Sequence, residues 1–172
     1  SLGHEVRLVS GRPAPNAGEA DRVIHGDGIM QIALAASPEE AFQPDGRRPR
    51  LARRILREVR LFAPDAILVQ NTWNLDSSIA SRLQGVAPVA LYLHDFAGIC
   101  PRSFRNPSCE GITCPSALDL AVRDLSACAR CVAPLVHGVS EERLGGLLGN
   151  RLENFLAETQ AVSLVLTPRR TH

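Results

Sequence analysis

The sequence predicts an α/β fold in which a parallel β-sheet is flanked by helices. Apolar runs at residues 66–70, 88–93 and 161–167 have the length and composition of buried strands. Stretches with helical periodicity lie between such runs, and parallel strands need crossover connections of that kind. The alternation of strand and helix therefore favours a parallel sheet covered by helices.

The first half of the chain contains two further strand candidates and one clear helix. Residues 6–9 and 29–35 are the strand candidates, and the turn-rich segment 11–18 ends the first of them. Between residues 51 and 62, apolar side chains recur at helical spacing while arginines occupy the other positions, as in an amphipathic helix. We expect this helix to end before Pro64.

In the second half, a short helix is predicted over residues 76–83 and a longer one over 141–159. Ser140 is a plausible N-cap for the longer helix, although the glycines early in that helix weaken it. Segment 95–133 shows neither helical nor strand periodicity. We expect it to be a cysteine-rich loop inserted after strand 88–93.

Size and charge exclude several classes of protein. At 172 residues the chain has room for one domain, and folding can bury roughly 70% of its unfolded surface. A formal net charge of +1 gives no support for binding nucleic acid through bulk attraction. All 19 basic residues are arginine, so lysine catalysis is excluded. No apolar run reaches the roughly 18 residues that span a bilayer, and we expect a cytoplasmic protein.

Two strand ends carry the side chains that could do chemistry. In doubly wound sheets, ligands bind beyond the carboxyl ends of the strands. Asn71 and Trp73 follow the strand at 66–70, and His94 and Asp95 follow the strand at 88–93. His94 would hydrogen-bond a sugar hydroxyl or phosphate, with Asp95 fixing its tautomer or binding a hydroxyl itself. The alternative, weighed evenly, is a His-Asp pair that merely caps a turn.

The other candidates near this edge also have two interpretations. Trp73 would stack on a sugar ring, although a single tryptophan more often packs in a core. Arg102 lies in the loop after His94 and would contact phosphate as a bidentate donor, or else anchor the loop.

The five cysteines have a spacing compatible with a metal site. Cys128 and Cys131 form a Cys-x-x-Cys pair, and Cys100, Cys109 and Cys114 precede them. Four thiolates can hold a tetrahedral structural zinc. The preferred ligands are Cys100, Cys109, Cys128 and Cys131. Reduced, partly buried thiols in a cytosolic protein are the alternative.

Residues 47–60 hold seven arginines against one acid, Glu58. A basic amphipathic helix of this kind can lie on anionic lipid. A solvated helix face is the more common explanation and is favoured here by roughly two to one.

Several motifs together resemble a known family. They are Gly3-His4-Glu5-Val6, the run from Pro64 to Val69 with Asn71 and Trp73, Leu93-His94-Asp95-Phe96, Cys100-Pro101-Arg102, Cys128-x-x-Cys131, and Val165-Leu166-Thr167-Pro168. In this order, over nearly the whole chain, they are similar to the acceptor-side N-terminal domain of GT-B-fold glycosyltransferases of family 4. The His-Asp-aromatic, Cys-Pro-Arg and Cys-x-x-Cys series is typical of one subgroup.

The resemblance implies a Rossmann-like domain over residues 1–172 and a retaining sugar transfer from a nucleotide-sugar donor to an acceptor hydroxyl. His94 matches the family histidine that faces the cleft between two domains, whereas a catalytic role of Asp95 is not carried over. Carbohydrate or lipid-linked acceptors are the implied partners, with polysaccharide or glycolipid synthesis as the context. Peripheral contact with the inner face of a membrane remains open.

The resemblance also implies that part of the domain is missing. The family's first strand, its Gly-rich loop and the donor-binding C-terminal domain have no counterpart here, so we expect an inactive, incomplete domain. The strands at Val6 and Ala66 should then lie without a shared partner between them. Two rivals stay open: a non-enzymatic binding module with a structural metal, and another Rossmann enzyme such as an oxidoreductase.

Overall fold

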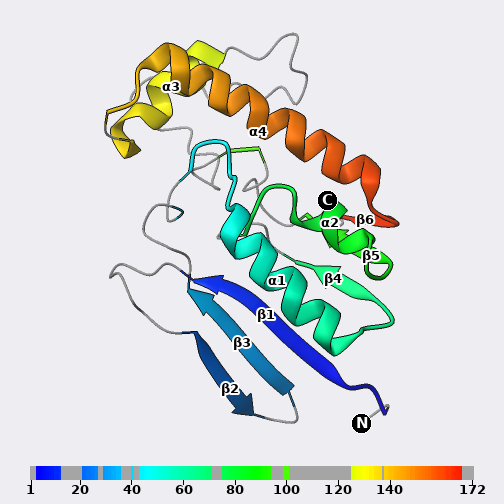
Figure 1. Ribbon diagram of the computed structural model, residues 1–172. Coiled ribbons are helices and arrows are strands. Elements are labelled where there is room, and N and C mark those ends of the chain that lie inside the picture. Colours follow the sequence, from blue (N-terminus) through cyan, green and yellow to red (C-terminus); the bar gives the residue numbers. More distant parts are fainter. Residues whose placement is uncertain are drawn as a thin grey trace, which may run out of the picture.

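A computed structural model of the protein describes residues 3–12, 21–26, 29–35, 40, 43–70, 75–93, 99–100, 125–136 and 138–167. These residues form two three-stranded sheets with helices packed against them (Figure 1). The elements in chain order are β1 (Val6–Arg12), β2 (Arg22–Gly26), β3 (Ile29–Ala35), α1 (Pro49–Phe62), β4 (Ile67–Val69), α2 (Ile79–Gln84), β5 (Val89–Tyr92), α3 (Leu125–Val132), the 3-10 turn η2 (Ala133–Leu135), α4 (Glu141–Ala161) and β6 (Leu164–Leu166).

The first sheet is mixed, which corrects the expectation of parallel strands throughout. Its order is β1-β3-β2, with β1 parallel and β2 antiparallel to β3. The strand β2 was not expected from the sequence. Its signal was the Asp27-Gly28 pair between β2 and β3, because a two-residue Asp-Gly connection is typical of a hairpin.

The second sheet is parallel throughout and confirms the three strands expected in the second half of the chain. Its order is β4-β5-β6, and Val69 of β4 lies opposite Leu91 of β5. Each strand is shorter than its apolar run. The helix α2 connects β4 to β5, and the longer connection to β6 ends in α4.

Helix α1 joins the two sheets into one core. Its apolar side turns Leu51, Ile55 and Val59 inward, as the spacing predicted. They pack in one cluster with Leu34 of β3 and Leu91 of β5, so side chains from both sheets meet on this helix. The helix ends at Ala63 in the left-handed conformation, immediately before Pro64.

Helices α3 and α4 form a second, smaller core. Ser140 caps α4 as predicted, since its side chain accepts a hydrogen bond from the Arg143 N–H at 3.3 Å. Helix α3 corrects the expectation of a loop throughout segment 95–133. A Cβ on Gly149 of α4 would meet the Leu125 side chain at 3.3 Å, so this glycine lets α3 and α4 approach closely.

Strands β1 and β4 do not pair with each other in the described structure. Strand β1 pairs only with β3, and β4 pairs only with β5. We call the space between them the slot; it is lined by residues 5–11 and 66–70, and its floor is made by α1 and α2.

Candidate functional site

The candidate site lies at the carboxyl edge of the parallel sheet. Strands β4 and β5 run side by side in the same direction, so the chain leaves both at the same edge. The predicted residues Asn71 and Trp73 come directly after β4, whereas His94 and Asp95 come after β5. All four, like Arg102, lie outside the described residues. The structure describes the edge at which β4 and β5 end and the groups around that edge.

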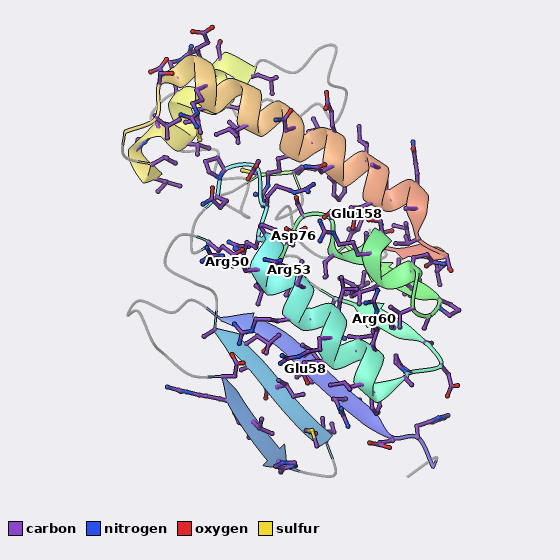
Figure 2. All side chains as sticks on the ribbon, in the orientation of Figure 1. Arg50, Arg53, Glu58, Arg60, Asp76 and Glu158 are labelled. Carbon is purple, nitrogen blue, oxygen red and sulfur yellow. The ribbon has the colours of Figure 1, made fainter. Side chains whose placement is uncertain are left out.

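Asp76 is the most buried polar residue at this edge, with none of its surface exposed. Its carboxylate accepts hydrogen bonds from the backbone N–H of Arg48 at 2.5 Å and from the backbone N–H of Ser78 at 2.9 Å. It also accepts one from the Ser78 hydroxyl. Arg48 stands at the start of α1 and Ser78 at the start of α2. Asp76 therefore holds two helix N-termini together (Figure 2).

Two further carboxylates complete these helix ends. Glu40 accepts from the Arg50 N–H in the first turn of α1, at 2.7 Å. Glu158 of α4 accepts from the Ser81 N–H of α2, at 2.9 Å. Neither helix has an acidic residue in its own first turn. The protein's own carboxylates thus fill positions where a helix N-terminus would otherwise attract a bound anion.

Two buried arginines lie near this edge, and one of them, Arg48, lies beside Asp76. The Arg48 guanidinium donates from Nε to the Glu40 carbonyl and from Nη1 to the Leu75 carbonyl, both at 2.7 Å. Arg151 of α4 donates from Nη1 to the carbonyl of Pro44 at 3.3 Å. These bonds tie segment 43–48 to the start of α2 and to α4.

Glycine is required at position 46 for this arrangement. Gly46 has a φ of +74°, and a Cβ there would lie 2.8 Å from Arg151 Nη1 and 3.0 Å from the Ser77 Cβ. Its carbonyl accepts a hydrogen bond from the Ser77 N–H at 2.8 Å. The positive φ strains any other residue here, and a Cβ would also force the Arg151 guanidinium to shift.

Burial sets the electrostatics of the two arginines. The pKa of Arg151 is lowered to about 10, first by burial and then by the neighbouring Arg48, against the opposing effects of Cys100 and Asp45. The pKa of Arg48 is also lowered by burial, and Asp76, Glu40 and Asp45 oppose this shift. Two cations are therefore held close together at the edge, with carboxylates near them.

Sequence reasoning missed Arg48, Asp76 and Arg151 as a connected group. Asp76 was placed at the start of the helix now seen as α2, and the turn-forming Pro44-Asp45-Gly46 stretch was available as a signal. No local pattern marks Arg151, because it occupies an ordinary position within an amphipathic helix. Its role depends on a contact with a residue more than a hundred positions away.

The predicted zinc ligands are only partly covered by the structure. Cys128 is buried against α4, and Cys100 and Cys131 are half-buried. In the described ranges, no three His, Cys, Asp or Glu side chains form a group that could hold a metal. Cys109 lies outside those ranges, as does Cys114. The four-cysteine zinc site stays a prediction.

The arginines of α1 form an exposed row. Arg50, Arg53, Arg57 and Arg60 are exposed, and Figure 2 labels three of them along the helix. Arg54 instead turns toward the sheet, where it donates to the Ala35 carbonyl at 2.7 Å and contacts Asp21. Among the described helices, none is long and apolar enough to cross a membrane.

Comparisons with known proteins give no family assignment. No family model matches the sequence, and no curated protein matches it.

Proposed function

We propose that this chain is the acceptor-side half of a glycosyltransferase that moves a sugar from a nucleotide-sugar donor to an acceptor hydroxyl. The observation that supports the proposal best is the parallel pairing of β4 with β5. Because the two strands are parallel, both end at the same edge of the sheet, which is where doubly wound sheets bind ligands. The motifs that follow these strands in the sequence are those that resemble family 4.

In this proposal the domain is Rossmann-like, with a cysteine-rich insertion after β5. His94 is the catalytic residue, and Asp95, Asn71, Trp73 and Arg102 bind substrate. The helix N-termini at the edge favour an acceptor rather than a phosphate, because Asp76 and Glu40 already accept their N–H groups. The donor's phosphates would then bind mainly on a second domain. The acceptor is a carbohydrate or lipid-linked sugar in the cytoplasm.

Replacing His94 by alanine in the full-length gene product is expected to lower turnover about 10²–10⁴-fold, because a positioned acid–base group contributes that much. The melting temperature of the His94→Ala variant should stay unchanged. The assay is release of nucleoside diphosphate from a panel of nucleotide sugars with a sugar acceptor. His25→Ala is the matched control, since His25 is exposed on the edge strand β2. Full activity of the His94 variant, or no sugar transfer from any donor by the native protein, would overturn the proposal.

We also propose that Cys100, Cys109, Cys128 and Cys131 hold a structural zinc ion. The purified protein is then expected to contain one zinc per chain by elemental analysis, and Cys131→Ser should lose it, because a tetrahedral site needs all four ligands. Cys114→Ser serves as the control and should keep the metal. A native protein without zinc, or a Cys131→Ser variant that retains it, would leave only the reduced-thiol interpretation.

A further inference from the structure

Arg48 is bonded to two neighbouring residues that lie just before α2, Leu75 and Asp76. Its guanidinium donates from Nη1 to the Leu75 carbonyl at 2.7 Å, and its backbone N–H donates to the Asp76 carboxylate at 2.5 Å. Figure 2 shows Asp76 beside the first turn of α1, where Arg48 is the N-cap residue. Two bonds to adjacent residues fix the direction of the chain at this point as well as its distance from α1.

The short segment that leads into α1 is itself held from two sides. The Gly46 carbonyl accepts a hydrogen bond from the Ser77 N–H at 2.8 Å. On the other side, Arg151 of α4 donates to the Pro44 carbonyl at 3.3 Å. Arg48 is therefore held against α2 and α4 by contacts of its own segment.

These contacts define one end of the four-residue segment 71–74, and β4 defines the other end. Val69 of β4 is buried and paired with β5. Leu75 is the first described residue after the segment, and it packs against the larger core. Each residue adds at most about 3.6 Å of extended chain, so fixing both ends of so short a segment restricts where its side chains can lie. Asn71 and Trp73, two of the proposed substrate-binding residues, belong to this segment.

Only arginine can make both bonds of the Arg48 side chain in this way. Nε donates to the Glu40 carbonyl and Nη1 donates to the Leu75 carbonyl, both at 2.7 Å. The two nitrogens lie at different depths along the side chain and point in different directions, because the guanidinium is planar and rigid. Lysine would keep a positive charge beside Asp76 and Glu40, but all its donors are on one nitrogen at the tip. It would therefore keep the charge and lose the fixed direction.

We propose that Arg48 is a positioning residue, which holds the end of segment 71–74 and so orients Asn71 and Trp73. It acts through the Leu75 carbonyl and the Asp76 carboxylate. The consequence for acceptor binding rests on the proposed function, in which Asn71 and Trp73 bind substrate. Binding of the acceptor then depends on Arg48, whereas binding of the donor does not, because the donor's phosphates would bind mainly on a second domain.

The fluorescence of Trp73 tests the positioning without an assay of activity. Trp73 is the single tryptophan of this chain, so its signal reports on segment 71–74. In Arg48→Lys the amplitude of its nanosecond motion, measured by time-resolved anisotropy, is expected to rise at least about twofold, because one end of the segment is loosened. Arg48→Met removes both donors and should give a rise at least as large. Arg48→Lys keeps the test decisive if Arg48→Met does not fold.

Arg54→Lys is the matched control. Arg54 also lies on α1 and also donates from Nη1 to a backbone carbonyl at 2.7 Å, that of Ala35 at the end of β3. The control loses the same kind of bond at the first sheet, so it should leave the motion of Trp73 unchanged. Each variant is measured well below its unfolding midpoint, so that partial unfolding does not contribute to the signal.

Steady-state kinetics of the full-length gene product test the link to substrate. Arg48→Lys is expected to raise KM for the sugar acceptor at least about tenfold, since small misplacements of binding groups are costly. KM for the nucleotide sugar, and kcat at saturating acceptor, should stay within about twofold, as when substrate binding rather than chemistry is impaired. A variant that was only less stable would lose active enzyme and leave both KM values unchanged.

Three results would contradict the inference. They are motion of Trp73 in Arg48→Lys equal to that in the native protein, an equal rise in Arg54→Lys, and a native acceptor KM in an active Arg48→Lys enzyme. A native protein that transferred no sugar would remove the proposed function alone. The fluorescence of Trp73 would still decide whether Arg48 positions segment 71–74.

Discussion

Asp76→Ala is expected to lower the free energy of unfolding by about 3–5 kcal/mol, the range found when one partner of a buried charged network is removed. The fully buried carboxylate accepts bonds from the backbone of Arg48 and Ser78 and lies beside the Arg48 guanidinium. Without it, two backbone donors lose their acceptor, and the buried Arg48 guanidinium loses a neighbouring negative charge. Urea unfolding followed by circular dichroism measures the change.

Two further variants make this result specific. Asp76→Asn keeps a hydrogen-bond acceptor but removes the charge. Its free energy of unfolding should therefore lie between those of the native protein and Asp76→Ala. Asp65→Ala is the matched control, since Asp65 is exposed, and surface changes of this kind stay within about 0.5 kcal/mol. If Asp76→Ala unfolded like Asp65→Ala, Asp76 would not hold the starts of α1 and α2 together.

Leu144→Ala is expected to cost about 2–5 kcal/mol, because it leaves a cavity in the small core between α3 and α4. Leu144 is fully buried there and packs with Cys128, Ala129 and Val132. Loss of this side chain should loosen α3 and raise the rate at which iodoacetamide modifies Cys128. Peptide mass spectrometry measures the modification at that cysteine alone.

Leu135→Ala provides the comparison for this experiment. Leu135 is exposed in η2, close to the same helices, so its removal should change neither unfolding nor the modification of Cys128. Repeating the labelling with a zinc chelator separates packing from metal binding. If Cys128 reacted equally fast in the native protein and in Leu144→Ala, the α3–α4 core would not be what protects it.

The helices were predictable from the sequence where their signals are local. The spacing of Leu51, Ile55 and Val59 predicted α1, and Ser140 predicted the start of α4. The strand β2 and helix α3 were missed. The strand β2 depended on a hairpin signal that was overlooked. Helix α3 is short and lies in the cysteine-rich segment that was interpreted as a loop.

The candidate site was likewise predicted only in part from the sequence. The order of strands and polar residues predicted an edge at which chemistry can occur, because side chains that follow parallel strands leave the sheet together. It did not predict that Asp76 and Glu40 would accept the N–H groups at the start of α1. These hydrogen-bond acceptors reach the helix because segments far apart in the chain pack together.

By itself the sequence determined the α/β class, the core side of α1 and the three strands of the parallel sheet, because periodicity and apolar runs are read locally. Only the tertiary structure decided that β2 is antiparallel, that Arg48 lies beside both Asp76 and Arg151, and that β1 and β4 leave a slot between them. The physical reason is that strand pairing and the burial of charge are satisfied by partners distant in sequence. A local pattern shows that a group needs a partner, whereas folding in three dimensions determines which partner it receives.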